Sequence, residues 1–436
     1  MKWAVAAVVV LIIGFIFNLG VLVYAMWALL ALLLATRWLT SRWTAAPKAI
    51  RVVSRTTAEI GNLVEVEISI TNEGRFPIAW ALIEEILPPG AISEHGRRLK
   101  LIGERLTVTR LAPGEEITLN YQLDCFRRGY FQLGPLVFES GDVFGLFRKY
   151  RVLCEPHYLM VLPKTHYIQG YDIDSRRPIG EIVMTHRLFE DPTRIAGVRR
   201  YQQGDPLSRI HWRATARTNE LHSKVFEPSS MAGATILLDF HQSAFDPKQE
   251  PFRSELAITS AASIANVIFE MNEQVGLISN GRDAVDRIKD EGWRGDRRTR
   301  DEAQKSIQMI GKSDRLRPIQ VPTRKHPGQM EDIRKALARL EITDGMTFPR
   351  LILESMSKMP RDASVIAILS NVDMEIGVAL GQLKRRGYAV TAIINTHEHD
   401  RFATLSGPLI NEGIETRIMA DEESIRSICN RQLLKS

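Results

Sequence analysis

The N-terminal stretch carries the longest run of hydrophobic residues in the chain. Residues 3–39 are almost all apolar, and the run is interrupted only at Asn18-Leu19-Gly20. A single helix of this length would measure about 50 Å, whereas the hydrocarbon core of a bilayer is roughly 30 Å thick. We therefore predict a transmembrane helical hairpin over residues 1–45. A secretory signal peptide is the alternative, but the apolar run is too long for one and no convincing small-residue cleavage site follows it.

Basic residues at the ends of this segment predict its orientation. Lys2 precedes the first span, and four basic residues follow the second, namely Arg37, Arg42, Lys48 and Arg51. Positive charge gathers on the cytoplasmic side of membrane helices. We therefore expect a protein of the inner (cytoplasmic) membrane, with its soluble domains on the cytoplasmic side and with Trp38 and Trp43 at the membrane interface.

Alternating apolar and polar residues dominate the next part of the chain. Residues 63–70 and 117–123 alternate in the manner of half-buried strands, and turns rich in Gly and Pro separate such runs. No helical stretch occurs among them. The pattern predicts a β-sandwich of immunoglobulin-like type over residues 46–153.

From residue 231 onwards, the pattern changes to strands that alternate with helices. Apolar runs predict strands at residues 234–240, 275–279, 364–369 and 389–394, and the segments around them predict helices at residues 255–271, 331–340, 349–356 and 376–386. This order is typical of a mostly parallel sheet covered by helices, so we predict a Rossmann-like α/β domain over residues 231–436. A charged run at residues 281–328 is expected to be a solvated, partly disordered insertion, whose basic blocks could contact anionic lipid head groups.

Composition narrows the function only slightly. The chain has 436 residues, enough for two or three domains, and its net charge of +6 is modest and spread out, so we do not expect nucleic-acid binding. The three cysteines, Cys125, Cys154 and Cys429, have no CxxC spacing, which is typical of a reducing compartment. No Walker-type phosphate-binding loop is present, so any ATP hydrolysis must come from another protein.

Residues 154–230 form a linker that ends in the densest group of cations and aromatic rings, and we call residues 197–227 the signature segment. Its candidate functional residues are Arg200, Tyr201, Gly204, Asp205, Arg209, Trp212, Arg217, Lys224 and Glu227. This density exceeds what a solvated loop needs. It indicates a surface that binds a partner or, with equal weight, a clasp in which a buried Trp212 holds two domains together.

Local patterns predict the backbone of the signature segment. Asp205 is placed to cap a helix that starts at Pro206, and i+4 spacing would then align Arg209, Arg213 and Arg217 in one stripe. Residues 221–227 alternate in the manner of a strand.

A catalytic role for this segment is not expected. No Ser, Cys or His in it has a base and an orienting acid at a suitable spacing. An enzyme of unknown reaction built around Asp205, Arg209 and His211 is kept as an alternative.

Two stretches have motif-like spacing. One reads Arg200-Tyr201-x-x-Gly204-Asp205-x-x-x-Arg209-Ile210-x-Trp212-x-x-x-Ala216-Arg217, followed by Leu221, Lys224 and Glu227; the other comprises residues 128–135 and 142–147. Both resemble the family called DUF 58, a domain of unknown function. The resemblance implies a membrane-anchored protein with a von Willebrand factor A-like C-terminal domain. It also implies partnership with AAA+ ATPases of the MoxR type, in the assembly or remodelling of complexes with other envelope proteins.

The first strand of the α/β domain ends in Asp239-Phe240-His241-Gln242-Ser243. This resembles the Asp-x-Ser-x-Ser loop in which von Willebrand factor A-like domains hold a divalent cation, and it implies a degenerate metal site at Asp239, Ser243 and Thr347. His241 replaces a Ser of that loop and Asn371 stands where an Asp would be expected, although Mg²⁺ prefers oxygen ligands with negative charge. We therefore expect no cofactor, with Mg²⁺ at this loop as the alternative.

Together these features predict a membrane-anchored, non-enzymatic adaptor that binds other proteins. A chiefly structural or adhesive protein working outside the cytoplasm is the second alternative, beside the enzyme.

Overall fold

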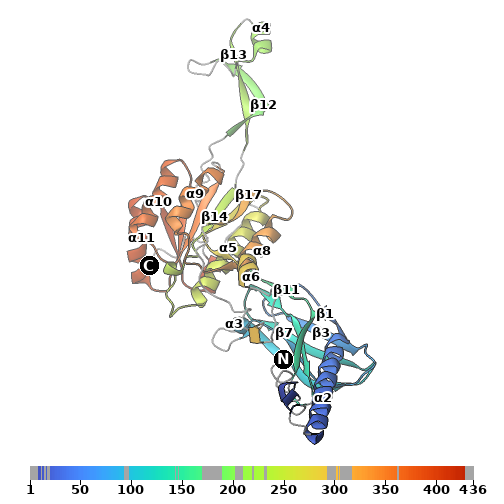
Figure 1. The fold of residues 1–436 in the computed structure, drawn as a ribbon. Helices are drawn as coiled ribbons and strands as arrows, with labels where there is room; N and C mark the ends of the chain where they lie inside the picture. Colours follow the sequence, from blue (N-terminus) through green and yellow to red (C-terminus); the bar gives the residue numbers. More distant parts are fainter. Residues whose placement is uncertain are drawn as a thin grey trace. The chain divides into compact units, whose positions relative to one another are not determined.

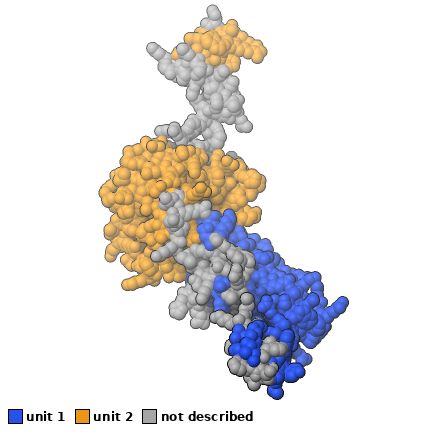
Figure 2. Space-filling model, viewed as in Figure 1, with its two compact units in different colours: residues 1–163, 283–311 blue, residues 164–282, 312–436 orange. Residues whose placement is uncertain are grey.

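The fold is that of a computed structural model (Figure 1). It describes residues 8–10, 12–13, 16, 20–92, 98–142, 144–145, 147–168, 189–201, 210–218, 220–229, 233–291, 301–302, 304, 317–360 and 363–427. For residues 189–197 and 224–229 only the backbone is described. The chain divides into two compact units, residues 1–163 with 283–311 and residues 164–282 with 312–436 (Figure 2).

Unit 1 contains three small sheets. The first has the order β1 (Pro47–Val53), β3 (Leu63–Asn72), β7 (Glu116–Cys125) and β5 (Leu99–Gly103). The second has the order β10 (Arg148–Cys154), β9 (Leu136–Gly141), β4 (Ile78–Glu85) and β6 (Leu106–Leu111). The third has the order β2 (Thr57–Glu59), β11 (His157–Leu162) and β8 (Gly129–Leu133), and β2 with β11 is the one parallel pair among these described strands.

The predicted alternation appears as alternating burial. Along β3 the side chains of Val64, Val66, Ile68 and Ile70 enter the core, while the residues between them are mostly exposed. β7 behaves in the same way, so the strands predicted at residues 63–70 and 117–123 are confirmed. Short helix α3 (Pro89–Ile92) follows β4.

Helix α2 (Gly20–Ala45) precedes the sheets, and most of the predicted turn at residues 18–20 lies outside the described residues. Its residues 23–45 are long and apolar enough to cross a membrane. The predicted first span lies mostly outside the described residues, because only residues 8–10, 12–13 and 16, all helical, are described there. The structure thus supports one apolar N-terminal helix.

The C-terminal end of α2 packs against the sandwich. Trp43 is 5% exposed and belongs to the sandwich core, so the expectation that it lies at a membrane interface is wrong. Thr40 and Thr44 are buried nearby, and their hydroxyls donate to the carbonyls of Thr36 and Thr40 at 2.9 and 3.0 Å. These polar side chains are satisfied by the helix itself, which allows this end of α2 to be buried in protein.

One of the stretches that resemble DUF 58, residues 128–135, has a structural role. Gly134 has φ +89°, and a Cβ atom there would collide with the guanidinium of Arg51 and approach Glu85. Only glycine tolerates both the backbone angle and this close approach. Of the aromatic side chains in residues 128–135 and 142–147, Phe131 lies in the core, whereas Phe144 is 61% exposed.

Unit 2 is built on one six-stranded sheet. Its order is β17 (Ile319–Arg324), β15 (Gln274–Ser279), β14 (Gly233–Leu238), β19 (Ser364–Leu369), β20 (Val390–Asn395) and β21 (Glu415–Met419). All neighbours are parallel except β15 and β17. The four predicted strands of the α/β domain are confirmed.

Helices cover both faces of this sheet (Figure 1). α5 (Phe252–Glu270) and α8 (Gln329–Arg339) share one hydrophobic core with the sheet, whereas α9 (Phe348–Ser355), α10 (Met374–Arg385) and α11 (His399–Asn411) share the other. Side chains of β14 enter the two cores alternately, with Ile236 and Leu238 on one face and Leu237 on the other. Helix α12 (Glu422–Ser427) follows β21.

The charged insertion predicted at residues 281–328 is partly wrong. It contains β16 (Arg282–Asp283), α6 (Ala284–Glu291) and β17, which is the antiparallel edge strand of the large sheet. β16 pairs with β18 (Leu340–Glu341). A strand forms here despite the surrounding charges because its backbone pairs antiparallel with β15 at the edge of the sheet, and its first three residues are half-buried.

Candidate functional site

The signature segment forms a β-hairpin with a short helix. β12 (Phe189–Arg200) pairs antiparallel with β13 (His222–Ser229), from Arg200 opposite His222 to Phe189 opposite Ser229. Helix α4 (Trp212–Thr218) precedes β13. The strand predicted at residues 221–227 is therefore confirmed, whereas β12 was not predicted.

The predicted helix start at Pro206 lies outside the described residues, but a helix does not continue from it through Ile210. Ile210 forms an isolated antiparallel bridge with Ser223 and is 4% exposed, so the backbone at this position is extended and not helical. α4 begins two residues later, and the Nδ1 atom of His211 accepts a hydrogen bond from the backbone N–H of Ala214 at 3.0 Å. His211 thus satisfies a free donor of the first turn, the role that had been expected of Asp205. Arg209 lies outside the described residues, so the predicted stripe is described only for Arg213 and Arg217, which both lie on α4.

The described signature residues are mostly exposed. Trp212 is 69% exposed, and Arg200 makes an exposed ion pair with Glu220, with Nη2 and Oε2 2.9 Å apart. The backbone N–H of Tyr201 donates to the carbonyl of Leu221 at 2.8 Å, and Arg217 lies in the exposed last turn of α4. Trp212 is thus not buried within unit 2, and the clasp between two domains stays a prediction.

Five candidate residues have no described side chain. Gly204, Asp205 and Arg209 lie outside the described residues, and Lys224 and Glu227 lie on β13, where only the backbone is described. Lys224 stands opposite Val198 in the hairpin. The enzyme alternative built on Asp205, Arg209 and His211 therefore has one described member, and that residue caps α4.

A second candidate site lies at the carboxyl edge of the large sheet. In open α/β sheets, ligands bind where the connections after two neighbouring strands leave in opposite directions. β14 and β19 form that pair, because β14 leads through α5 to β15 and β19 leads through α10 to β20. Asp239 follows β14 directly, and Ser370 follows β19.

Asp239 is 3% exposed and is held by its own loop and by one distant amide. Its Oδ1 atom accepts from the backbone N–H of His241 at 3.1 Å and from Nδ2 of Asn280 at 2.9 Å. Asn280 also accepts from the backbone N–H of Phe240 and donates to the carbonyl of Met346. Burial raises the pKa of Asp239 to about 6, although these hydrogen bonds oppose the rise.

The other predicted metal ligands are arranged differently. The Ser243 hydroxyl lies 2.7 Å from Nδ1 of His241, and Thr347 is exposed at the N-terminus of α9. Ser370 receives a hydrogen bond from Nδ2 of Asn395 at 2.9 Å. The hydroxyl groups of Ser243 and Ser370 thus each have a nitrogen atom as hydrogen-bond partner.

This donor set does not fit a resident magnesium ion. It offers one carboxylate, and that carboxyl group has a raised pKa, whereas Mg²⁺ takes several hard oxygen donors with negative charge. The neighbouring carboxylate of Asp373 caps α10 by accepting from the N–H of Ile376 at 2.8 Å. Within the described parts of the chain, no three His, Cys, Asp or Glu side chains are grouped to hold a metal.

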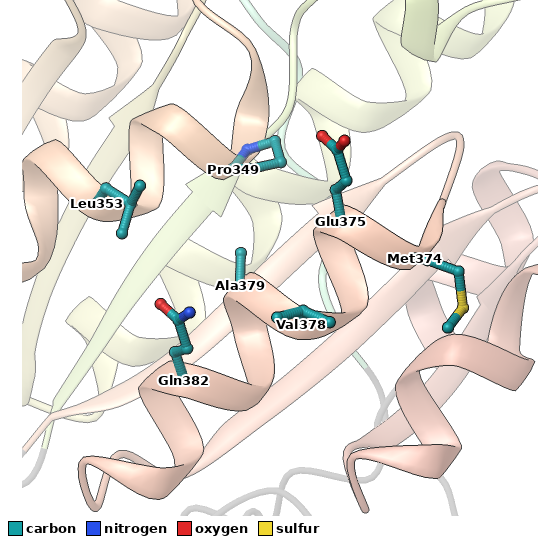
Figure 3. A pocket seen from close by; sticks show the side chains of 7 residues that line it. All are labelled: Pro349, Leu353, Met374, Glu375, Val378, Ala379 and Gln382. Carbon is teal, nitrogen blue, oxygen red and sulfur yellow. The ribbon is translucent and has the colours of Figure 1, made fainter.

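An apolar groove lies beside this edge, between α9 and α10. Its volume is about 320 Å³, and it is lined by Pro349, Leu353, Met374, Glu375, Val378, Ala379 and Gln382 (Figure 3). Glu375, Ala379 and Gln382 point from α10 toward α9. Leu353 and Met374 are 61% and 66% exposed, which is unusual for a pair of large apolar side chains lining one groove.

Sequence reasoning missed two buried residues that organise this edge. Asn280 ties the Asp239 loop to the segment before α9, and Arg253 of α5 donates to Oδ1 of Asn395 and to the carbonyl of Ala420. Polar residues at the end of a buried strand were the available signal for Asn280 and Asn395. Arg253 gives no such signal, because it lies inside an ordinary helix start.

Part of the chain is similar to known proteins. Residues 197–340 match the family model described as "Protein of unknown function DUF58". The chain is 26% identical over 238 residues to the "Uncharacterized protein YeaD" of Bacillus subtilis (strain 168). That match covers 54% of this chain and 56% of the relative, so the chain spans about half the length of this curated protein.

Solved structures give weaker likenesses. The CARDB domain of the PF1109 protein from Pyrococcus furiosus, in complex with di-metal ions, is 14% identical, with a TM-score of 0.17, and the match covers 26% of this chain and 91% of that chain. Native alpha-2-macroglobulin from Escherichia coli is 15% identical, with a TM-score of 0.20 over 27% of this chain and 24% of that chain. These scores carry no conclusion about this chain. Over residues 197–340, which include Trp212 and Asp239, the chain is similar to the DUF58 family.

Proposed function

We propose that this protein is a membrane-anchored adaptor that binds other proteins and catalyses no reaction of its own. Its proposed partner is an AAA+ ATPase of the MoxR type, acting with other envelope proteins whose complexes are assembled or remodelled. The family resemblance supports the choice of partner, and the exposed residues of the structure support the choice of binding surfaces.

The observation that carries the proposal is the exposure of Trp212. A tryptophan buries more apolar area than any other side chain when it enters an interface, and Trp and Arg are enriched among the residues that dominate binding energy. Trp212 is 69% exposed on α4, beside the exposed Arg213 and Arg217. Leaving such a side chain in water is unfavourable unless a partner covers it.

The α9–α10 groove provides a second surface for the same function. An amphipathic helix places side chains at i, i+3 and i+4 into such a groove. The groove belongs to the domain that we propose to be von Willebrand factor A-like. The central position of β14, with Asp239 at its carboxyl end, supports that assignment. Because the Asp239 loop does not fit Mg²⁺, binding is proposed to use apolar contacts without a bridging metal.

The membrane part of the proposal rests on α2. The residues from Gly20 to the first charge at Arg37 would span about 26 Å at 1.5 Å per residue, close to the roughly 30 Å of a bilayer core. Val21, Tyr24 and Trp27 are exposed, with fractions of 86%, 78% and 54%. The basic C-terminal flank favours the cytoplasmic side of the inner membrane for the soluble units.

Affinity purification of the full chain in mild detergent, with and without ATP, tests the proposal. Wild type is compared with Trp212→Ala, with Val378→Asp in the groove, and with Tyr167→Ala as a matched exposed aromatic residue outside both surfaces. A MoxR-type ATPase should co-purify with wild type and Tyr167→Ala, and its recovery should fall in the first two variants. Equal recovery from all four proteins would remove the support for both surfaces.

A further inference from the structure

The strand β10 runs alongside the C-terminal part of α2 in the same direction. Nζ of Lys149 donates to the hydroxyl of Ser41 at 2.7 Å, and Nη1 of Arg151 donates to the carbonyl of Ala45 at 2.8 Å. Two strand residues thus advance about as far as four helix residues, as expected from rises of about 3.4 and 1.5 Å per residue. The turn before β10 therefore lies level with helix residues that precede Ser41, toward the apolar part of α2.

That turn presents an exposed phenylalanine. Asp142 fixes the turn by accepting the backbone N–H of Phe147 on its side chain at 2.6 Å, and its own N–H donates to the carbonyl of Phe147 at 3.0 Å. Phe144 at the tip is 61% exposed. An exposed aromatic ring in a turn that the hydrogen bonds between Asp142 and Phe147 close, beside an apolar helix, points to a covering surface of low polarity.

A second turn places another phenylalanine at the same helix. Phe76, between β3 and β4, is 43% exposed and meets Trp38 of α2 edge to face, with ring centroids 5.6 Å apart. Asn72 holds this turn by donating from Nδ2 to the carbonyl of Phe76 at 3.1 Å. The guanidinium of Arg42 lies 5.4 Å from the centre of the Trp38 ring.

The charges around these rings are mainly positive. Five exposed basic residues lie on α2, next to Phe76 or at the start of β10, namely Arg37, Arg42, Arg75, Arg148 and Lys149. Of the acidic groups, Glu73 pairs with Lys48 at 2.6 Å, Glu139 lies 3.9 Å from Arg148, and Asp142 is buried in its turn. Excess positive charge beside exposed aromatic rings suits the anionic head-group layer of a membrane.

We propose that Trp38, Phe76 and Phe144, with these five basic residues, form a collar that enters the head-group layer of an anionic bilayer. The inference rests on the proposed membrane anchoring and extends it from α2 to the sandwich. Because Trp43 fixes α2 to the sandwich core, insertion of α2 brings both turns to the bilayer surface together. The collar would hold unit 1 against the membrane in one orientation, in contrast to a domain on a free tether.

Photo-crosslinking of the full chain in nanodiscs tests the collar. p-Benzoylphenylalanine is placed at position 144, at position 32 on α2, and at position 108 on β6. Leu32 and Val108 are 45% and 62% exposed, and β6 is at the edge of its sheet opposite β10, so position 108 is a matched control away from α2. The nanodiscs contain phosphatidylcholine alone or phosphatidylcholine with phosphatidylglycerol, and lipid adducts are identified by mass spectrometry.

The collar predicts lipid adducts at positions 32 and 144 and about tenfold fewer at position 108, because only the first two side chains reach the membrane. The yield at 144 should rise with phosphatidylglycerol and return to the phosphatidylcholine level in Arg75→Gln/Arg148→Gln. Adducts at 32 without adducts at 144 would overturn the collar and leave the anchor intact. Absence of adducts at 32 would overturn the anchor itself, and equal yields at 144 and 108 would show that the contact is non-specific.

Discussion

Arg51 of β1 and Glu85 of β4 form an ion pair inside the sandwich, with Nη2 and Oε2 2.8 Å apart and both side chains 0% exposed. The same guanidinium donates from Nη1 to the carbonyl of Glu155 at 2.6 Å and lies 2.9 Å from Nδ1 of His157. The pair therefore joins three segments that lie far apart in the sequence. The ion pair also explains why residues 128–135 include a glycine at position 134, because Gly134 lies beside Arg51 and Glu85.

Removing one partner of this pair should destabilise the sandwich strongly. In Glu85→Gln the buried guanidinium loses its counter-charge, which costs about 3–5 kcal/mol for a pair of this kind. Hydrogen exchange of the full chain in detergent should show faster exchange in β1 and β4. The exposed pair of Lys48 and Glu73 serves as control, since Glu73→Gln should cost less than about 1 kcal/mol. Similar effects from both substitutions would contradict the role given to the buried pair.

Trp43→Ala should loosen α2 from the sandwich. Truncating a buried tryptophan costs about 3–5 kcal/mol through lost burial and the cavity that remains. We expect faster hydrogen exchange in β9 and β10, which contact α2. Trp27→Ala, which truncates a 54% exposed side chain of the same helix, should leave these strands unchanged. Unchanged exchange in both variants would mean that Trp43 does not fix the helix.

Asp239→Asn should stabilise unit 2 at neutral pH. The pKa of Asp239 is raised from 3.8 to about 6 by burial, so the folded state favours the protonated carboxyl group. The preference for the protonated carboxyl group stabilises the folded state fully below pH 3.8. This stabilisation is lost as the pH rises through about 6, and the loss amounts to roughly 3 kcal/mol at pH 7 and above. Asparagine keeps the acceptor for His241 and Asn280 without a charge to bury.

The measurement is the thermal unfolding temperature of wild type and Asp239→Asn at pH 7.5 and near pH 4. The variant should be more stable at pH 7.5, and the difference should shrink as the pH falls. Asp246→Asn is the matched control, because Asp246 also accepts a backbone N–H two residues on, from Lys248 at 3.0 Å. An equal gain for Asp239→Asn at both pH values would show that ionisation is not the cause.

Magnesium should not change the stability of the protein. The Asp239 loop offers one carboxylate, so Mg²⁺ at millimolar concentration and a chelator are both expected to leave the unfolding temperature unchanged. A rise with Mg²⁺ that disappears in Asp239→Asn would show that this loop binds the ion despite His241 and Asn371.

Much of the fold could be predicted from the sequence, because the pattern of buried and exposed positions along a strand or helix appears directly as a pattern of apolar and polar residues. β3 and β7 alternate along their length, and β14 and β19 are buried throughout because helices cover both faces of a parallel sheet. Strands without such a pattern were missed. β17 lies in a charged run, and β12 reads Phe-Glu-Asp-Pro-Thr-Arg-Ile-Ala-Gly-Val-Arg-Arg, which has no regular alternation.

The candidate site was predicted less well, because its geometry depends on contacts between distant residues. Asp205 and Pro206, which have the residue types of a helix start, lie outside the described residues. The helix that is described, α4, follows the bridge between Ile210 and Ser223 and is capped by His211. Trp43 has the same local pattern as an interfacial tryptophan, and only the sandwich core decides its position. Asn280 meets Asp239 across 41 residues of chain, a distance that no local pattern encodes.

Photo-crosslinking in living cells from position 212 of the full chain tests the central claim most directly. With p-benzoylphenylalanine in place of Trp212, the account predicts an adduct with a second protein, identified by mass spectrometry as an AAA+ ATPase of the MoxR type. The same amino acid at position 167 should give no such adduct. Absence of any protein adduct at 212, or the same adducts at both positions, would contradict the account.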